Sequence, residues 1–388
     1  MSYIKNYLDE LVKYCEKEDF RGWDPYDALN SVFFQSSPFR HFKITRIIWT
    51  QLFKNSPFNL RNILAVAKEY NPKALALFIS SYVNLYRALN AAEYKEKISY
   101  LIKKLLTLQS KGYSGYCWGY NFDWQSRTFF IPKFTPNVIV STFVGNAFLD
   151  VYEITKDKTF LEIPRSICDF ILKDLNRNYE DNFFSFSYSP KDKSKIFNAS
   201  LLASKLLARV YCFTKEDILK DEAKESVELC VKYQNHDGGW FYGLDNNQKW
   251  IDSFHTAYNL EAIYAYRLYT QDNNYSEQLE RGTHYYLRKF FTEEGIPKFY
   301  ADQIFPIDIH SSASLAVFLA KTGLFRKHLS LLDRVLFWSF NNMQDKQGYF
   351  YYQINRYYKI KIPYIRWACA WMFYALSSYL YSEKALSN

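Results

Sequence analysis

One repeated layout constrains the fold of this chain more than any other feature. Five segments each contain an amphipathic helix, a polar loop rich in glycine or aromatic residues, and a second helix rich in small residues. Equivalent positions near the start of the second helices are Ser141, Ala199, His255, His310 and Arg366. They are separated by 58, 56, 55 and 56 residues, and so regular a period over five units indicates a repeat architecture.

The two helices of each unit differ as a double ring of helices requires. The segment 221–233 has one apolar and one charged face, as expected of an outer helix. The segment from Asn198 carries small residues all round, which lets neighbouring inner helices approach closely. The sequence predicts a degenerate sixth unit upstream, with its inner helix at 72–89 and its outer helix near 41–54. Residues 1–22 are predicted to form an N-terminal capping helix.

The repeat predicts an all-α fold. We expect an α/α toroid in which residues 1–388 form one domain of six helix hairpins around a central cavity. Closure of the ring is inferred from the number of units and from polar clusters that recur at one position of the inner helices. An open solenoid would explain the repeat equally well.

The composition favours a ligand with flat faces and permits an anionic one. Aromatic residues make up 20% of the chain, and their rings suit sugars, isoprenoids or nucleobases about equally. The net charge of +9 is dispersed without a basic stripe. We therefore expect either a solvated surface or an anionic ligand, and no nucleic acid.

The sequence carries no targeting or cofactor signal. Its six cysteines form neither a CxxC nor a zinc spacing, a pattern typical of buried thiols in a reducing compartment. The first 20 residues lack the apolar core of a signal peptide, and no run of 18 apolar residues is present. Nucleotide-binding and zinc-protease motifs are missing as well. We expect a cytoplasmic protein with no transmembrane segment, metal or cofactor.

The candidate catalytic residues lie at equivalent positions in successive repeats. Asp252 and His255 occur in WIDSFHT, and Asp308 and His310 occur in PIDIHSS, each at the start of an inner helix. A helix N-terminus favours anionic ligands, and a carboxylate that orients an imidazole is a common acid–base set. Each aspartate would serve equally well as a simple N-cap. Arg366 occupies the matching place in the last repeat, where it would bind a carboxylate or phosphate, or pair with a neighbouring aspartate.

Two loops supply candidate substrate-binding residues. An aromatic surface with planar hydrogen-bonding groups suits a sugar, and the first loop offers Trp118, Tyr120, Asp123, Trp124 and Arg127. The second loop offers Asp237, Trp240 and Tyr242. The alternative is structural in both cases. The tryptophans would seal the toroid, and Asp-Gly-Gly is a turn signal.

The motifs GYCWGYNFDWQSR (115–127), FIPKFTPNVIVSTFVGNAFLD (130–150) and GGWFYGLD with KWIDSFHTAYNLEAI resemble the VpsJ-like proteins of bacterial exopolysaccharide and capsule biosynthesis. The resemblance covers the chain from about Trp23 to its end. Some members carry the label delta-aminolevulinic acid dehydratase, which does not fit a chain without alternating β and α elements or a zinc–cysteine cluster. QNHDGGW is more distantly similar to a motif of squalene-cyclase toroids, and the plan resembles six-hairpin glycosidases. The resemblance implies a saccharide or lipid-linked saccharide as ligand, and association with the polysaccharide synthesis machinery.

Three functions follow as hypotheses. The first is an enzyme that acts on a uronate-bearing or lipid-linked saccharide by hydrolysis, elimination or epimerisation. In a hydrolase Asp252 and Asp308 would be acid and base, whereas in a lyase or epimerase His255 or His310 and a tyrosine would move the proton at C5. The second is a non-catalytic glycan-binding scaffold, with a filled centre. The third is an isoprenoid-binding, cyclase-like protein, with a cavity lined almost wholly by Phe and Leu.

Overall fold

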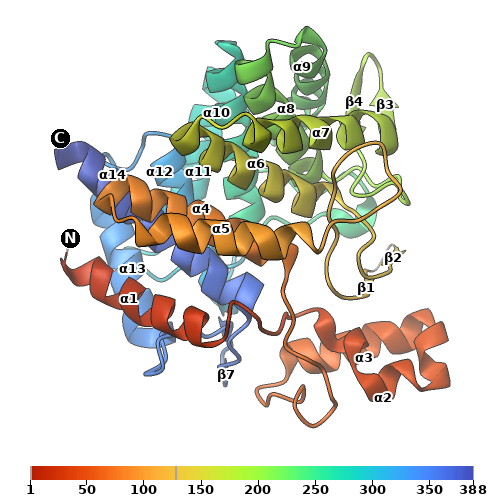
Figure 1. Ribbon diagram of the computed structural model, residues 1–388, viewed down its shortest axis with the longest axis vertical. Coiled ribbons are helices and arrows are strands. Elements are labelled where there is room, and N and C mark those ends of the chain that lie inside the picture. The colour runs from red at the N-terminus through yellow and green to blue at the C-terminus, as the bar shows by residue number, and fades with distance from the viewer. Residues whose placement is uncertain (1, 127–128, 388) are drawn as a thin grey trace.

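The computed structural model describes residues 2–126 and 129–387, which are mostly helical (Figure 1). The inner helices are α4 (Pro72–Leu89), α6 (Val138–Thr155), α8 (Phe197–Thr214), α10 (Ser253–Thr270), α12 (Ile309–Lys321) and α14 (Trp371–Ser387). The outer helices are α1 (Ser2–Lys17), α5 (Glu93–Leu106), α7 (Thr159–Asp174), α9 (Asp217–Lys232), α11 (Ser276–Lys289) and α13 (Leu329–Met343).

The inner helices form a closed ring. Each packs against the next in the order α4, α6, α8, α10, α12 and α14, and α14 packs back against α4. The Asn84 amide donates a hydrogen bond to the Ser378 hydroxyl across that last seam, at 3.0 Å. The chain thus has the predicted all-α fold, an α/α toroid, and the alternative of an open solenoid is wrong.

N-caps fix where several inner helices begin. Asn71, Asn137, Asp252 and Asp308 each precede an inner helix and accept a hydrogen bond from a backbone N–H of its first turn. Such a side chain satisfies an N–H that has no partner within the helix. The caps lie at equivalent ends of the hairpins, so they place four helix N-termini on one rim of the ring.

The sixth outer position is occupied by α1. Its Tyr7 ring stacks on Phe340 of α13 with centroids 4.0 Å apart, and its Glu16 accepts a hydrogen bond from Tyr82 of α4. α1 also packs against α14. It is therefore an integral part of the outer ring, and the prediction of an outer helix near 41–54 is wrong.

The segment near 41–54 belongs instead to an insertion, residues 18–71, between α1 and α4. The insertion contains η1 (Asp27–Asn30), α2 (Val32–Gln35), η2 (Pro38–His41) and α3 (Lys43–Asn55). α3 packs on η1, η2 and a strand of the next loop, and Figure 1 shows α2 and α3 set apart from the ring. Helical periodicity identifies a helix and its apolar face but not the element that covers this face. This is why the segment near 41–54 was wrongly predicted to be an outer helix of the ring.

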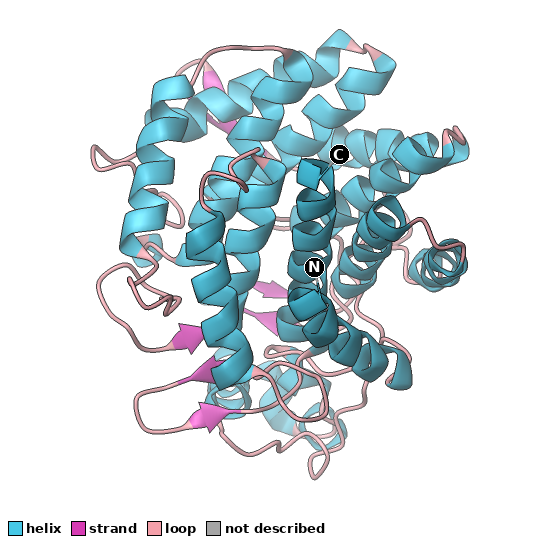
Figure 2. Ribbon diagram, turned by 90° about the vertical axis from the view of Figure 1, so that its left-hand side faces the viewer, coloured by secondary structure: helices cyan, strands magenta, loops and turns pink. Residues whose placement is uncertain are grey.

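Short strands occupy the loops that lead from an outer to an inner helix (Figure 2). β1 (Trp124–Gln125) pairs with β2 (Phe130–Ile131), and β3 (Arg177–Glu180) pairs with β4 (Phe183–Phe186). β6 (Gln353–Ile354) lies between β5 (Ile307–Asp308) and β7 (Lys359–Ile360). All pairs are antiparallel, and they stiffen the loops at the rim where the inner helices begin.

Among the described residues, α6 alone is long and apolar enough to match a membrane span. It is an inner helix of the ring, and 67% of its 18-residue window is buried inside the protein. Its apolar character is that expected of a helix enclosed by neighbours on every side.

Candidate functional site

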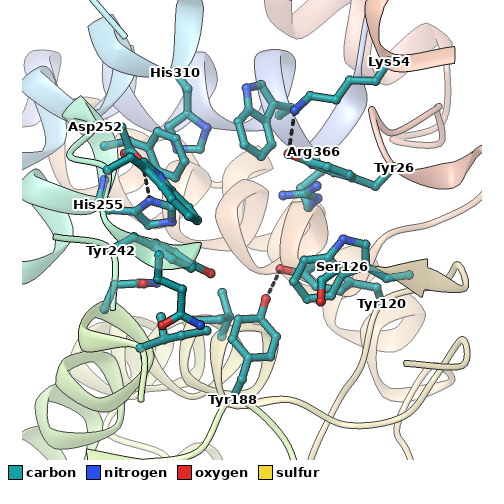
Figure 3. A pocket seen from close by; sticks show the side chains of 18 of the residues that line it. Tyr26, Lys54, Tyr120, Ser126, Tyr188, Tyr242, Asp252, His255, His310 and Arg366 are labelled. Atoms are coloured by element: carbon teal, nitrogen blue, oxygen red, sulfur yellow. Dashed lines mark hydrogen bonds and ion pairs between the residues drawn. The ribbon is translucent and has the colours of Figure 1, made fainter. Parts of the chain in front are cut away.

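A cavity of about 830 Å³ opens at the rim where the inner helices begin. Its walls come from the starts of α4, α10 and α12, from the loops before α6, α8 and α10, and from the insertion. Figure 3 shows Asp252, His255 and His310 on one side of this space and Arg366 and Tyr120 on the other. The cavity thus opens beside the inner-helix starts that carry the candidate catalytic residues, and residues 120–126 of the loop before α6 form part of its wall.

Asp252 and His255 form a hydrogen-bonded pair on the cavity wall. Asp252 Oδ1 accepts from the His255 backbone N–H at 3.0 Å, so the aspartate is the N-cap of α10. Its Oδ2 lies 2.7 Å from His255 Nδ1 and also accepts from the Trp250 indole at 3.1 Å. Because Nδ1 is bound to the carboxylate, Nε2 is the nitrogen of His255 that is available to a ligand. The N-cap alternative and the acid–base arrangement are therefore both realised at Asp252.

His310 faces the same cavity from the next inner helix. Its Nε2 lies 2.7 Å from the Tyr258 hydroxyl, and no described side chain or backbone group bonds its buried Nδ1. Burial lowers the pKa of His310 well below its usual value, and the charges of Lys73 and Arg366 add to this effect. Burial also raises the pKa of Tyr258 well above its usual value. The pair is thus a neutral imidazole and a protonated phenol.

Asp308 does not line the cavity. It caps α12 by accepting from the His310 backbone N–H at 2.9 Å, and it also accepts from the side chains of Gln353 and Trp367, at 2.7 and 2.9 Å. Burial raises its pKa to about 6 in spite of these bonds. All its contacts position neighbouring elements, so the structure favours the N-cap alternative for Asp308.

Arg366 reaches the cavity from η4 (Ile365–Ala370), the π-helical turn that leads into α14. Its Nε and Nη2 donate to the two carboxylate oxygens of Asp24, and both side chains are only 4% exposed. Burial disfavours the charged guanidinium, but Asp24 more than offsets this and raises the pKa of Arg366. The expected pairing with an aspartate is present, and Nη1 is the nitrogen that this pair leaves for a ligand.

Lys73 is a cavity residue that the sequence reading missed. It lies in the first turn of α4, is 3% exposed, and carries its ammonium nitrogen 4.1 Å from the Phe143 ring centroid and 5.4 Å from that of Trp371. No described carboxylate pairs with it. Burial lowers its pKa well below the usual value, and the neighbouring Arg366 charge acts in the same direction. The feature of the sequence that could have identified Lys73 is its place in the first turn of a predicted inner helix, but the repeat pattern is degenerate in this unit.

The cavity carries more cationic than anionic groups. Among the described lining residues, Lys54, Lys73 and Arg366 are basic, and Asp252 alone is acidic. Lys54 comes from α3 and donates to the Tyr26 hydroxyl at 3.2 Å. Tyr26 and Lys54 belong to the insertion, and the repeat pattern gave no reason to place them at the site. The excess of basic groups suits an anionic ligand.

Only some of the predicted binding residues reach the cavity. Tyr120, Trp124 and Tyr242 line it, and Tyr242 stacks on Trp250 with centroids 4.5 Å apart. The Tyr120 and Tyr188 hydroxyls lie 3.3 Å apart (Figure 3). These rings form the aromatic wall that the composition led us to expect.

The other predicted binding residues are structural. Trp118 and Trp240 are buried and donate to the backbone carbonyls of Leu105 and Cys230. Asp123 accepts from the Lys133 backbone, and Asp237 holds a turn by accepting from Gly239. None of these four side chains lines the cavity, and the contacts they make are packing or turn contacts. Arg127 lies outside the described residues.

The described residues contain no cluster of three or more His, Cys, Asp or Glu side chains that would hold a metal ion. The described lining combines imidazole, guanidinium, amine, carboxylate, phenol and indole groups with four phenylalanines, three isoleucines and no leucine. Such a lining does not match the Phe- and Leu-rich cavity expected of an isoprenoid-binding protein.

Comparison with solved structures identifies the fold. A cellobiose 2-epimerase from Bacillus thermoamylovorans is 13% identical, with a TM-score of 0.64 over 81% of this chain and 88% of that one. An unsaturated glucuronyl hydrolase specific for heparin is 12% identical, with a TM-score of 0.62 over 97% and 95%. A GH76 α-mannanase from Bacteroides thetaiotaomicron is 12% identical, with a TM-score of 0.61 over 81% and 87%. At these identities the likeness establishes the shared six-hairpin toroid fold. No family model and no curated protein matches the sequence.

Proposed function

We propose that this protein is an enzyme that moves a proton on an anionic, uronate-bearing saccharide, by epimerisation or β-elimination. The observation that carries the proposal is the pair of histidines, His255 and His310, which face one cavity together with basic groups and a single carboxylate. The similar structures include a cellobiose 2-epimerase and an unsaturated glucuronyl hydrolase. A saccharide that carries a uronate would suit the basic and aromatic groups of this cavity.

His255 is the proposed base. With Nδ1 held by Asp252, Nε2 takes the proton from the carbon next to the substrate carboxylate, and the electron pair moves into that carboxylate. The Asp252 charge stabilises the imidazolium that forms. Arg366 and Lys73 stabilise the charge that develops on the substrate, because hydrogen-bond donors held in a dry site act most strongly where charge develops.

The Tyr258–His310 pair is the proposed acid. The ring centroids of His255 and Tyr258 are 6.1 Å apart in an edge-to-face contact, so the proposed base and acid lie next to each other at the cavity. In an epimerase Tyr258 gives its proton to the opposite face of the carbon while His310 holds the phenolic oxygen in place. The proton that His255 took then returns to the tyrosinate through water, which restores both groups. In a lyase Tyr258 protonates the oxygen that leaves the adjacent carbon. Either reaction uses the same first step.

Hydrolysis with Asp252 and Asp308 as acid and base has less support. A glycosidase of that kind needs two carboxyl groups on either side of the scissile bond. Asp308 is buried beneath Trp367 with both oxygens occupied, and Asp252 is the only acidic residue among the described lining side chains.

The cellular setting is part of the proposal. Six free cysteines, five of them buried, and the resemblance to exopolysaccharide and capsule proteins favour a cytoplasmic role in polysaccharide biosynthesis, beside the synthesis machinery. The substrate would then be a free or lipid-linked saccharide.

Turnover of uronate-containing oligosaccharides tests the proposal. Wild-type protein should convert at least one of them, and His255→Ala and His310→Ala should lose at least about a hundredfold in rate, the usual size of an acid–base contribution. His236→Ala is the matched control, since His236 is an exposed histidine outside the cavity, and it should keep the wild-type rate. Binding without turnover would support the scaffold hypothesis instead, and full activity of both cavity variants would exclude these roles.

A further inference from the structure

The insertion exposes an unusual number of large apolar side chains. Eight are at least 58% exposed, of which Val32 and Ile63 are two. The other six are Phe33, Phe39, Phe42, Ile44, Ile48 and Phe58. They come from α2, η2, α3 and the connections around them, which pack on one another. We call these six residues, together with Leu52, the apolar face. One exposed apolar side chain is ordinary, but so many exposed apolar side chains in one small substructure indicate a binding surface.

Three faces of α3 lie in different environments: the protein interior, the cavity and the solvent. Thr50 and Phe53 are buried within the protein, and Ile47, Gln51 and Lys54 line the cavity. Ile44, Ile48 and Leu52 are exposed and, at a spacing of four residues, lie on one stripe. At 100° per residue this stripe borders the cavity stripe directly. The apolar face therefore begins at the edge of the cavity mouth.

The central part of the insertion, between Asp27 and Glu69, carries charge of one sign. No acidic residue occurs between Asp27 and Glu69, whereas that interval contains six lysines and arginines. Arg40, Lys43 and Arg46 form no ion pair with a described residue, and Arg40 instead donates to the Gln35 carbonyl. Arg40 and Lys43 are exposed and lie just before Ile44 at the start of α3, whereas Arg46 turns to the loop before α6, where it donates to Gln125 and lies over the Phe130 ring. The apolar face is thus flanked by uncompensated positive charge.

We propose that the apolar face docks on a lipid bilayer that contains anionic lipids. Apolar side chains that enter the boundary between headgroups and acyl chains, combined with basic residues that contact anionic headgroups, are the features of an interfacial membrane-binding element. The positive charge beside the exposed apolar side chains complements anionic headgroups, and this is why we infer an anionic membrane as the binding partner. Docking would hold the cavity mouth at the membrane, where an amphiphilic substrate is presented. The inference does not rest on the proposed reaction, since it concerns a different surface.

Co-sedimentation with vesicles tests the proposal. Wild-type protein should bind vesicles that mix phosphatidylcholine and phosphatidylglycerol, and should bind vesicles of phosphatidylcholine alone more weakly. High salt should weaken binding to the mixed vesicles, because it screens the basic contribution. The double variant Ile48→Ser with Leu52→Ser should bind at least about tenfold more weakly, since two large side chains no longer leave water.

A matched control pair lies away from the insertion, with Ile218 at the start of α9 and Leu268 near the end of α10. Ile218 and Leu268 are 53% and 55% exposed, close to the 60% and 52% of Ile48 and Leu52. The double variant Ile218→Ser with Leu268→Ser should bind vesicles like wild type. Arg40→Gln with Lys43→Gln should weaken binding to anionic vesicles only, and it leaves the apolar residues in place should the serine variant fail to fold by circular dichroism.

Three results would overturn the proposal. One is the absence of wild-type binding to the mixed vesicles. Another is equal binding by wild type and the Arg40→Gln, Lys43→Gln variant. The third is self-association of wild type in light scattering that the serine substitutions abolish, which would assign the apolar face to a second copy of the chain.

Discussion

The His310 ring is buried among aromatic side chains, and this burial opposes its protonation. Phe254, Trp367 and Trp371 pack on its ring, with centroids 4.6, 4.9 and 4.5 Å away. Burial has the largest effect on its pKa, and the charges of Lys73 and Arg366 follow. The ring is therefore a neutral hydrogen-bond partner of the Tyr258 hydroxyl and not a cation at rest.

The titration of His310 is therefore predicted. In histidine-labelled protein its NMR signal, assigned with His310→Gln, should keep the neutral-imidazole shift from about pH 7.5 to about pH 5.5. The unfolded chain takes up a proton at this residue below about pH 6.5, so its contribution to stability is present above that pH and is lost below it. A His310 midpoint at or above the usual histidine value would contradict this account.

Lys73 provides a second test at the same scale. Lys73→Met keeps an unbranched chain against Phe143 and Trp371 but removes the amine. We expect the free energy of unfolding to stay within about 1 kcal/mol of wild type, because the lost cation–π contact is offset by the relief of a desolvated amine. Turnover should fall by at least about tenfold, as expected when a donor to developing charge is removed. Normal turnover with a large loss of stability, measured by urea unfolding, would make Lys73 structural.

At the scale of single residues, the sequence predicted which side chains are candidates for the site but not which contacts each of them makes. Asp252 and Asp308 occupy equivalent positions, and both proved to be N-caps. One of them also bonds a cavity histidine, whereas the other bonds Gln353 and Trp367 behind the wall. That difference depends on side chains distant in sequence. Similarly, Trp124 lines the cavity while Trp118 seals the core, and their separation of six residues does not distinguish them.

At the scale of elements, a buried ion pair joins the insertion to the last repeat. Asp24 binds Arg366 from one side, and nearby Arg61 donates to Asp27 at 2.7 Å and to the Asp24 carbonyl at 2.7 Å. Burial raises the pKa of Asp27 to about 6, although the Arg61 charge opposes this. These contacts hold the first part of the insertion against η4. They also set the position of Arg366 in the cavity.

Breaking this pair should be costly. Asp24→Asn leaves the Arg366 guanidinium buried without its counter-charge, and we expect a loss of about 3–5 kcal/mol in the free energy of unfolding, measured with denaturant. Asp181→Asn is the matched control, because Asp181 forms an ion pair with Lys232 at 2.7 Å but is 71% exposed. The control should unfold like wild type. Equal behaviour of the two variants would show that the Asp24–Arg366 pair does not stabilise the fold.

The elements of the ring were predictable, and those of the insertion were not. Five outer-to-inner hairpins share one period, which identified ten of the ring helices, and the degenerate unit identified α4. α3 has the same amphipathic character as an outer helix, but its covered face packs on η1, η2 and β1. The sixth outer helix is α1, separated from α4 by the whole insertion. Tertiary packing, which no local pattern encodes, decided between these two helices.

At the scale of the whole molecule, closure of the ring makes the site. The first and last inner helices, α4 and α14, meet through Asn84 and Ser378. This brings Lys73 from the first repeat together with Arg366 from the last and with the histidines between them. The cavity therefore combines groups from most of the chain. An open array of the same repeats would leave these groups apart.

The central claim, that this cavity removes a proton from carbon, has a direct test. A uronate-containing oligosaccharide labelled with deuterium at C5 distinguishes the proposed chemistry from hydrolysis. If the claim is correct, wild-type protein releases the label to water during turnover, and His255→Gln, with Nε2 no longer available as a base, does so at a rate lower by at least about a hundredfold. Turnover that leaves the deuterium in the product would contradict the claim, because a hydrolase cleaves the glycosidic bond without touching C5–H.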